Sequence, residues 1–383
     1  MASPNTLVVM PLAEQRGGAE LALMHLLAQS SLPSRTKWAI AFLEEGPMVE
    51  QAHRLGAAVR VIRSGRLRQV NSYIDCVHSI ARWAVEINAS TIIGWMSKAQ
   101  LYGGPAGMLA RKPAVWFQHG IPGGAIDWIA SAIPAKGVLC CSEQVAAMQR
   151  RSFPRHDIRV VYPGVELERF DSDSLPSPAQ ARQELAIPAD GPLVGIVARL
   201  QRWKGVHVVL EAMEHLWESF PNARCVVVGG EHSLERAYAT KITEFASKVS
   251  RPDRLHLVGQ QSDAPIWMQA MDVVVHASRK EPFGMVVIEA MSLGKPVVAS
   301  IPGGPAEVIT NGVDGLLVNF GDARQLGQAI GFFLNDPNLM ERCGRAAKIR
   351  AADFSAIHFS GNVSDAVSSL LAVSNPHREQ TVD

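Results

Sequence analysis

The chain has 383 residues, of which 47% are hydrophobic and 19% are charged, and its 37 Lys and Arg residues nearly balance its 36 Asp and Glu residues. This length exceeds one ordinary hydrophobic core, so two domains of a globular protein are expected. The near-zero net charge supplies no global field for nucleic acid, and no nucleic-acid partner is predicted.

Short β-branched runs alternate with helical patterns through the first half of the chain. The segments with helical spacing include Ala19–Ser30, Val70–Ile87 and Glu143–Phe153. The predicted strands are Thr6–Met10, Lys37–Phe42, Ala58–Ile62, Thr91–Gly94, Ala114–Gln118, Gly137–Cys141 and Ile158–Tyr162. Such alternation favours right-handed βαβ units and therefore a mostly parallel sheet.

A second alternating series follows Ser172–Pro178, whose Ser and Pro content is typical of a linker. Its predicted strands are Leu193–Ala198, Cys225–Val228, Leu255–Val258, Val273–His276, Val297–Ser300 and Leu316–Val318. Its predicted helices are Ala179–Leu185, Val206–Phe220, Leu234–Val249, Ala264–Met271, Gly284–Leu293 and Ala323–Asn335, with a last helical pattern at Ala356–Val373. The sequence therefore predicts an α/β fold with two doubly wound domains, whose ligands bind at the carboxyl ends of the strands.

The cysteines and the opening residues bear on where the protein works. The five cysteines form no CxxC pair and no metal-ligand spacing, so we expect reduced, buried thiols, a cytoplasmic protein and no metal site. The opening residues, MASPNTLVVMPLAEQ, have no basic region before a long apolar core, so no signal peptide is predicted. No apolar run reaches the length of about 18 residues that a membrane span needs.

Two glutamates flank a predicted helix start in the stretch KEPFGMVVIEAMSLGKPVVAS. Glu281 and Glu289 are separated by seven residues, and Gly284 lies between the first of them and an apolar helix. The unpaired amides of a helix start favour an anion such as a phosphate, while the carboxylates suit neutral hydroxyls on either side. Eight helical residues cover roughly 12 Å, which suits a sugar, a pyrophosphate and a ribose in turn. An amphipathic helix with one solvated and one capping Glu fits the spacing equally well.

Three further turns carry candidate residues at predicted strand ends. Gly17 and Gly18 follow Arg16 and open a helix, so backbone can approach a ligand there, although such a pair is usually only a turn. Arg199 and Lys204 would suit a pyrophosphate, although two cations in such a turn are more often solvated surface residues. His119 begins the glycine-rich turn HGIPGG, where a histidine bonded to the turn backbone is the commoner outcome. Neither the dinucleotide fingerprint nor a Walker A lysine is present.

Two other patterns concern metals and membranes. The sequence Asp171-Ser172-Asp173 resembles a DxD metal motif, but it lies in the linker and nothing nearby completes a metal shell, so we reject it. A basic cluster, defined as Arg60, Arg63, Arg66 and Arg68, could contact an anionic membrane or be a solvated face.

Several of these pieces together resemble the family 4 retaining glycosyltransferases, whose fold of two Rossmann-like domains facing across a cleft is called GT-B. The matching pieces, in order, are RGGAE, HG after Ala114–Gln118, VVYPGVELERF, VARLQRWKG, VVVGGE, LVGQQSDAP and VVHASRKEPFGMVVIEAMSLGKPVVASIPGGPAEVITNGVDGLLV. They cover nearly the whole chain, and the last piece, with its E-x7-E pair, is the most specific. The chain departs from the family pattern at Ala198, where Gly is common, and at Pro163, where Asn is common.

The resemblance implies a domain plan and residue roles. Residues 1–170, joined by the C-terminal helix in 356–383, would form the acceptor domain, and residues 171–355 the donor domain. The implied catalytic residues are His119 by the transferred sugar, Arg199 and Lys204 on the pyrophosphate and Glu281 on the sugar hydroxyls. The implied donor-binding residues are Gly17, Gly18, Gly229, Gly230, Val258, Gln260, Phe283, Gly284, Met285, Val286 and, on the ribose, Glu289.

The activity implied by the resemblance is hexosyl transfer with retention, without a metal or cofactor, through a front-face mechanism. A UDP-sugar is the first expected donor and GDP-mannose the second. The expected acceptor is a glycan or a lipid-linked glycan, as in polysaccharide or lipopolysaccharide biosynthesis. A nucleotide-sugar epimerase and a non-catalytic sugar-nucleotide binding protein stay open as alternatives, whereas the missing glycine fingerprint disfavours a dinucleotide-dependent dehydrogenase.

Overall fold

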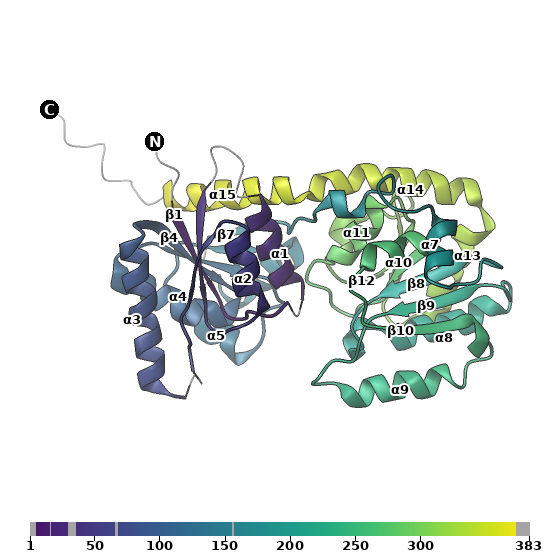
Figure 1. Cartoon of the computed structure of the whole chain (residues 1–383), viewed down its shortest axis with the longest axis horizontal. Helices are drawn as coiled ribbons and strands as arrows, with labels where there is room; N and C mark the ends of the chain where they lie inside the picture. Colours follow the sequence, from purple (N-terminus) through teal and green to yellow (C-terminus); the bar gives the residue numbers. More distant parts are fainter. Residues whose placement is uncertain (1–4, 16, 30–35, 66–67, 155–156, 373–383) are drawn as a thin grey trace. The chain divides into compact units, whose positions relative to one another are not determined.

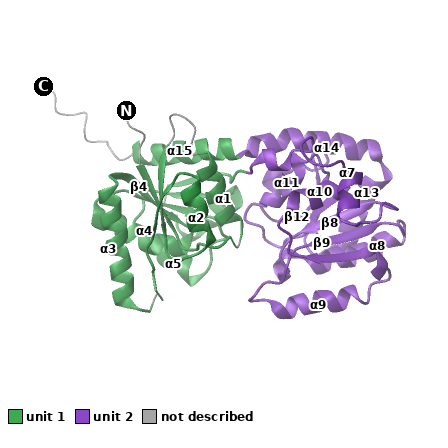
Figure 2. Cartoon of the chain, viewed as in Figure 1, with its two compact units in different colours: residues 1–164, 356–383 green, residues 165–355 purple. Residues whose placement is uncertain are grey.

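The structure is a computed structural model that describes residues 5–15, 17–29, 36–65, 68–154 and 157–372. The chain divides into two compact units (Figure 2), Met1–Gly164 with Ala356–Asp383, and Val165–Ser355. The second unit thus begins six residues before the expected boundary at 170/171. The reason is the short 3-10 helix η1 (Leu167–Phe170), whose Phe170 is buried and whose Phe170 carbonyl accepts a hydrogen bond from Ser292 Oγ at 3.0 Å.

The first unit is built on a parallel sheet in the order β3-β2-β1-β4-β5-β6-β7. Its strands are β1 (Asn5–Met10), β2 (Lys37–Phe42), β3 (Ala58–Val61), β4 (Ala89–Trp95), β5 (Ala114–Gln118), β6 (Val138–Cys140) and β7 (Ile158–Val160). Strands β2 and β3 lie on one side of β1, and strands β4 to β7 lie on its other side. The topological switch point, where such sheets bind ligands, therefore lies between β1 and β4.

The helices of the first unit come from both ends of the chain. They are α1 (Gly18–Ala28), α2 (Pro47–Arg54), α3 (Val70–Glu86), α4 (Ser97–Ala110), α5 (Ala125–Ala132), α6 (Glu143–Ser152) and α15 (Ala356–Ala372). Helix α15 packs in this unit, with the Phe359 ring 6.2 Å from the Phe117 ring and Ser364 Oγ 3.4 Å from Thr36 Oγ1. The last helix of the chain therefore completes the first unit (Figure 1).

The second unit has its own parallel sheet in the order β10-β9-β8-β11-β12-β13. Its strands are β8 (Leu193–Val197), β9 (Arg224–Val228), β10 (Leu255–Gly259), β11 (Val273–His276), β12 (Val297–Ile301) and β13 (Leu316–Asn319). Its helical segments are α7 (Pro178–Glu184), η2 (Arg202–Lys204), α8 (Val206–Trp217), α9 (Arg236–Ala246), η3 (Pro252–Arg254), α10 (Ala264–Ala270), α11 (Met285–Ser292), α12 (Pro305–Val308), α13 (Ala323–Asn335), α14 (Pro337–Ala351) and η4 (Ala352–Phe354). The switch point of this sheet lies between β8 and β11.

The four central strands of the second sheet, β8, β9, β11 and β12, are buried along nearly their whole length, whereas the edge strands β10 and β13 are largely accessible. Strands β9 and β11 are buried at every position, as expected for parallel strands covered by helices on both faces. Helices pack closely on this sheet and on each other. A Cβ on Gly327 in α13 would lie 2.9 Å from the Ala212 carbonyl oxygen in α8, so only glycine permits this approach. Full burial of each Val or Ile in such a core stabilises the unit by roughly 1.5–3 kcal/mol.

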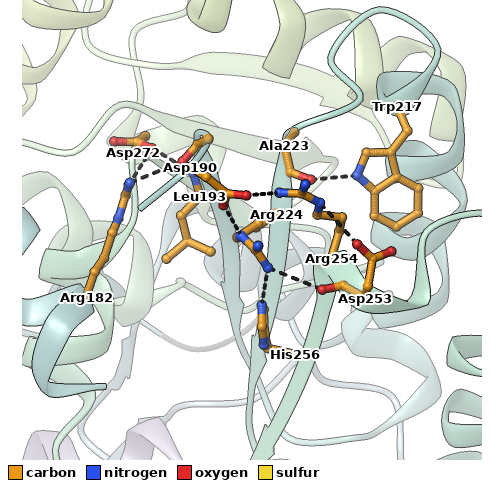
Figure 3. Close-up of polar contacts among 11 residues, drawn as sticks. Arg182, Asp190, Leu193, Trp217, Ala223, Arg224, Asp253, Arg254, His256 and Asp272 are labelled. Carbon is orange, nitrogen blue, oxygen red and sulfur yellow. Dashed lines mark hydrogen bonds and ion pairs between the residues drawn. The ribbon is translucent and has the colours of Figure 1, made fainter. Parts of the chain in front are cut away.

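The amino ends of β8, β9 and β10 are joined by ion pairs (Figure 3). Asp190 accepts from Arg224 Nε and from Arg254 Nη1, both at 2.8 Å. Hydrogen bonding from Arg224, together with Arg254, lowers the pKa of Asp190 to about 2 against the opposing effect of burial. Nearby, Asp272 accepts from Arg182 Nη2 at 2.5 Å and from the backbone amide of Leu193 at 2.7 Å. This edge of the sheet is thus held by structural ion pairs, which leaves the opposite edge for ligands.

Candidate functional site

The carboxyl ends of β8 and β11 bring together candidate residues that are far apart in sequence. Arg199 and the short helix η2 with Lys204 follow β8, and Glu281 lies five residues after the end of β11. Because β8 and β11 are neighbours at the switch point, these residues lie at the edge of the sheet where open α/β sheets bind their ligands.

Lys204, His276 and Glu281 form a partly buried charged cluster. Lys204 Nζ donates to Glu281 Oε2 at 2.6 Å, and His276 Nε2 lies 3.1 Å from the same oxygen. The three side chains are only 16%, 6% and 12% exposed, respectively. Burial by itself would raise the pKa of Glu281, but the Lys204 charge and the hydrogen bonds from His276 and Lys204 hold it well below its usual range. Glu281 is therefore an ionised hydrogen-bond acceptor at neutral pH.

Backbone contacts fix the two loops that carry this cluster. Gly205, just after Lys204, has φ of +72°, and a Cβ there would lie 2.0 Å from the Ala277 carbonyl oxygen. The amide of Arg279 donates to the Trp203 carbonyl at 2.7 Å, so the loop after β11 is tied directly to η2. Lys204 Nζ also lies 4.0 Å from the centre of the Trp203 ring. The positions of the Lys204 ammonium and of the Glu281 loop are thus mutually dependent.

Helix α11 starts immediately after this loop and carries the second glutamate. Gly284 caps the helix with φ of +99°, and Phe283 before it is buried 5.8 Å from the Phe354 ring. Met285 is buried and Val286 half-buried in its first turn. Glu289 is only 6% exposed, and burial raises its pKa to about 7 despite the nearby positive charge of Arg169. The two glutamates of the motif therefore differ sharply in acidity, which spacing alone did not indicate.

The ends of β9 and β10 lie beside the loop that follows β8. The Gly229 amide donates to the Gly259 carbonyl at 2.8 Å, and the Gly230 carbonyl accepts from the Leu200 amide at 2.9 Å. Gly229 has φ of +158°, and a Cβ there would lie 1.8 Å from the Ala198 carbonyl oxygen. Close backbone packing therefore requires glycine at this position whatever it binds.

The side chains expected to border the base lie on the same edge. Gln260 is exposed and Val258 is half-buried. A Cβ on Gly230 would approach Gln260 Cβ to 2.9 Å, so Gln260 lies next to the Gly229–Gly230 turn. The predicted donor-binding residues of the second unit thus share one sheet edge, and their contacts with a donor stay predictions.

In the first unit, His119 lies at the carboxyl end of β5 in an aromatic stack. Its ring centre is 4.0 Å from that of Phe117 and 4.7 Å from that of Trp95. Burial lowers the pKa of His119 to about 3, so the imidazole is neutral at physiological pH. Its Nε2 is buried and has no hydrogen-bond partner among the described residues.

The glycines at the start of α1 belong to the same neighbourhood. Gly17 is the N-cap of α1 and Gly18 its first residue, while Arg16 lies outside the described residues. Trp95 Nε1 donates to the Ala19 carbonyl at 2.9 Å, and the same Trp95 ring packs on His119. The structure therefore brings the predicted Gly17–Gly18 turn and the predicted histidine to the switch-point edge of one sheet.

Sequence reasoning missed one residue at these edges, His276, and the hydrogen-bond partners of another, Asp127. His276 contacts Glu281 directly, and its only signal is a polar residue that ends a buried β-run, as at His119. Asp127 accepts hydrogen bonds from the HGIPGG turn, among them the Gly124 amide at 2.9 Å.

The basic cluster is partly neutralised by acidic neighbours. Arg60 makes two hydrogen bonds with Glu86, at 2.8 and 2.6 Å, and Arg63 bonds Glu45 at 3.3 Å. Arg68 is exposed, whereas Arg66 lies outside the described residues. The positive charge that the sequence assigns to this face is therefore reduced by two ion pairs.

The described residues also bear on membrane spans, metal binding and disulfides. Within the part of the chain that the structure describes, no helix is long and apolar enough to cross a bilayer, and no group of three His, Cys, Asp or Glu side chains could hold a metal. Asp171 of the rejected DxD motif bonds Lys348 Nζ at 3.1 Å. All five cysteines are buried, and none of them is in a disulfide.

The fold defines the class of protein. Two Rossmann-like units, the first completed by the last helix, form the GT-B architecture expected from the sequence. The crystal structure of HepE from Anabaena in complex with UDP and glucose superposes with a TM-score of 0.84 over 96% of this chain and 100% of that chain, at 24% identity. A glycosyltransferase from Rickettsia africae superposes with a TM-score of 0.87 over 97% of this chain and 99% of that chain, at 20% identity. At these identities the likeness shows the fold alone.

The sequence comparisons add the family. Residues 178–350 match the family model described as glycosyl transferases group 1, and the second unit belongs to this family. The D-inositol 3-phosphate glycosyltransferase of Corynebacterium urealyticum is 34% identical over 202 residues, 52% of this chain and 48% of that protein. The protein of the same name from Nocardia farcinica is 27% identical over 326 residues, 79% of this chain and 68% of that protein. The match spans about half the length of the D-inositol 3-phosphate glycosyltransferase of Corynebacterium urealyticum and of several other proteins of that name. The resemblance to a glycosyltransferase family is thereby confirmed over residues 178–350.

Proposed function

We propose that the chain is a retaining glycosyltransferase that moves a hexose from a nucleotide sugar to a glycan or a lipid-linked glycan. The observation that carries this proposal is the cluster of Lys204, His276 and Glu281 at the switch point of the second unit. A buried ammonium suits a phosphate, and an ionised carboxylate beside it suits the hydroxyls of a sugar. The family of the second unit supports the proposal, and the complexes of HepE with UDP and with UDP-glucose favour a UDP-sugar as donor, ahead of GDP-mannose.

The proposed donor changes the partner of Lys204. In the structure its ammonium is held by Glu281 Oε2 at 2.6 Å. An incoming pyrophosphate offers that ammonium new oxygen partners, and this frees lone pairs of Glu281 to accept from sugar hydroxyls. Glu281 stays ionised during the exchange because His276 still faces the same oxygen. The ion pair thus keeps Glu281 ionised before the donor arrives.

The proposed transfer proceeds on one face of the sugar. The bond from the anomeric carbon to the β-phosphate oxygen breaks, the acceptor oxygen bonds to the same face, and the departing phosphate oxygen takes the acceptor proton. Arg199, Lys204 and the first amides of α11 would stabilise the growing negative charge on the phosphate. Loss of one such preorganised donor costs about 2.7–4 kcal/mol in the transition state. This route assigns no nucleophile, metal or cofactor to the enzyme.

The remaining predicted residues complete the proposed site. Glu289 would bind the ribose hydroxyls, with Gly229, Gly230, Val258 and Gln260 beside the base. The backbone of Phe283, Gly284, Met285 and Val286 would approach the sugar and phosphate, and Gly17 and Gly18 would approach the donor phosphate. His119, which is neutral, would lie by the transferred sugar and donate a hydrogen bond or accept one.

The test is turnover of UDP-glucose and GDP-mannose, each with and without an acceptor panel. The panel includes D-inositol 3-phosphate, the compound in the names of the relatives. The anomeric configuration of the product by NMR tests retention, and a parallel assay with EDTA tests independence of metal. Full transfer by Glu281→Ala would overturn the assignment of the site, whereas Glu86→Ala, which removes a surface carboxylate, is expected to transfer normally.

Two rival functions give different outcomes in the same assay. A nucleotide-sugar epimerase converts the donor without an acceptor and transfers nothing. A non-catalytic binding protein is stabilised thermally by a nucleotide but turns over no donor with any acceptor.

A cytoplasmic location with peripheral membrane contact through Arg63 and Arg68 is part of the same proposal. Binding to anionic liposomes should weaken when both residues are changed to Ser, and unchanged binding would remove that contact.

A further inference from the structure

We propose that Asp127 is a positioning residue that holds the loop carrying His119 in the geometry that sugar transfer needs. This inference rests on the proposed function, and it concerns contacts wholly within the first unit. Asp127 lies in the first turn of α5, three residues after the N-cap Gly124, and its side chain is half-buried. Among the described residues, its side chain accepts hydrogen bonds from Ser97, Gln118, Gly123 and Gly124, none of which is assigned to the site, so its effect is through the loop.

One carboxylate oxygen of Asp127 binds the far end of the HGIPGG loop. Oδ2 accepts from the amide of Gly123 at 3.0 Å and from the amide of Gly124 at 2.9 Å. A Cβ at Gly120 or Gly123 would meet no atom within 4 Å, so side-chain packing does not hold the loop at these points. Gly123 also has φ of +151°, a conformation that residues with side chains rarely adopt. The two hydrogen bonds to Asp127 therefore restrain this end of the loop at its glycines, next to the buried Pro122.

The other carboxylate oxygen binds the near end of the loop and a neighbouring helix. Oδ1 accepts from Gln118 Nε2 at 3.1 Å, and Gln118 is the buried last residue of β5, immediately before His119. Oδ1 also accepts from the hydroxyl of Ser97, the first residue of α4. One side chain thus links the end of β5, the start of α4 and both ends of the 119–124 loop.

The chemistry of this arrangement requires a carboxylate. Four groups donate to Asp127, and a carboxylate can accept all four because it has about four lone-pair sites and no hydrogen. Burial opposes ionisation, but the hydrogen bonds from Ser97, Gly124, Gln118 and Gly123 lower the pKa of Asp127, so the side chain is ionised at neutral pH. An asparagine of the same size would offer one accepting oxygen and place an NH₂ group against donors.

The histidine depends on this restraint because its ring and its backbone are held separately. Phe117 and Trp95 fix the ring plane by stacking, while the loop that Asp127 binds begins at the His119 backbone. The carbonyl of His119 accepts a weak bond from Cys141 Sγ at 3.5 Å. A displacement of about 1 Å in a reacting group can reduce the rate about 100-fold, so loosening this loop should reduce turnover more than donor binding.

The decisive variant is Asp127→Asn, with Asp157→Asn as the matched control. Asp157 is a carboxylate of the same unit whose side chain bonds Arg159 on the surface. Hydrogen–deuterium exchange of residues 119–124 should be about tenfold faster in Asp127→Asn than in the wild-type chain, and unchanged in Asp157→Asn. With UDP-glucose and an acceptor, kcat should fall about 10- to 100-fold while KM for the donor stays within about twofold. Far-UV circular dichroism checks that the variant is folded. Ser97→Ala removes one of the four donors to Asp127, together with the contact between Ser97 and Gln118 Oε1, and supplies a milder variant with a smaller fall in kcat.

The outcomes separate this inference from the proposed function. Wild-type exchange of the loop in Asp127→Asn, or faster exchange with wild-type kcat, would overturn the positioning role. A rise in donor KM with unchanged kcat would also overturn it, because it would place Asp127 in donor binding. If the wild-type chain turned over no donor, the proposed function would fail, and the positioning role in transfer would fail with it. The exchange measurement, which needs no substrate, would still decide whether Asp127 holds the loop.

Discussion

The ion pair between Lys204 and Glu281 makes a prediction about stability that needs no substrate. The two atoms are 2.6 Å apart and the side chains are 16% and 12% exposed, so the pair is largely shielded from solvent. Removing one partner of a buried pair typically costs about 3–5 kcal/mol, because the other charge is left uncompensated. We therefore expect Lys204→Met and Glu281→Gln each to destabilise the chain, and the double variant to lose less than the sum.

The assay is a double-mutant cycle of the free energy of unfolding by urea at pH 7. A coupling energy of about 1–3 kcal/mol between Lys204 and Glu281 is expected for charges in direct contact. Because the folded-state pKa of Glu281 lies below its ordinary value of 4.5, the stability that its ionisation contributes is present above about pH 4.5 and is lost as the pH falls toward the folded-state pKa. The coupling should therefore shrink on acidification. A coupling near zero at pH 7, or one that grows at acid pH, would refute the electrostatic reasoning for this site.

Three further predictions concern residues around the site and the core of the second unit. Burial raises the pKa of Glu289 to about 7, so the stability that its neutral form contributes is fully present below about pH 4.5 and is lost as the pH rises through 7. Glu289→Gln should therefore flatten the pH dependence of the free energy of unfolding across that window, and an unchanged slope would contradict the raised pKa. Asp272→Ala should lower the free energy of unfolding by about 3–5 kcal/mol, because it leaves the buried Arg182 unpaired, and a change below about 1 kcal/mol would contradict this. Gly205→Ala should lower the free energy of unfolding by at least about 1–2 kcal/mol, because φ at Gly205 is positive and the Ala277 carbonyl blocks a Cβ there. Donor binding, measured by calorimetry, should weaken in the same variant. Wild-type stability together with wild-type donor affinity would argue against a fixed Lys204 loop.

The alternating pattern of the chain was sufficient to predict its strands. Each predicted strand occurs in the structure with its ends shifted by no more than two residues, because parallel strands covered on both faces are continuous apolar runs.

Helix α4 was not anticipated, since SKAQLYGGPAGMLA contains Pro105 and three glycines, all poor helix formers. Tertiary packing overrides that propensity. A Cβ on Gly104 would lie 2.3 Å from Ile133 Cγ2, so the glycines allow α4 to pack against its neighbours.

The candidate site was less predictable than the fold, because sequence gives residue types near a strand end but not their partners. Lys204 and Glu281 are 77 residues apart, and the same pattern allowed two solvated side chains. The buried ion pair forms because β8 and β11 are neighbouring strands, and this pairing is a property of the sheet order that neither segment shows by itself.

His276 shows how this limit affects the chemistry. Only the fold places its Nε2 on the same carboxylate oxygen that Lys204 binds, and these two neighbours are what keep Glu281 ionised despite its burial. Burial raises the pKa of Glu289, in the next helix, and the positive charge of Arg169 offsets this only in part, so Glu289 is far less acidic. Two glutamates with seven residues between them in one motif therefore differ in acidity. Lys204 and the histidine at the end of β11 hold the pKa of Glu281 low, while burial raises the pKa of Glu289.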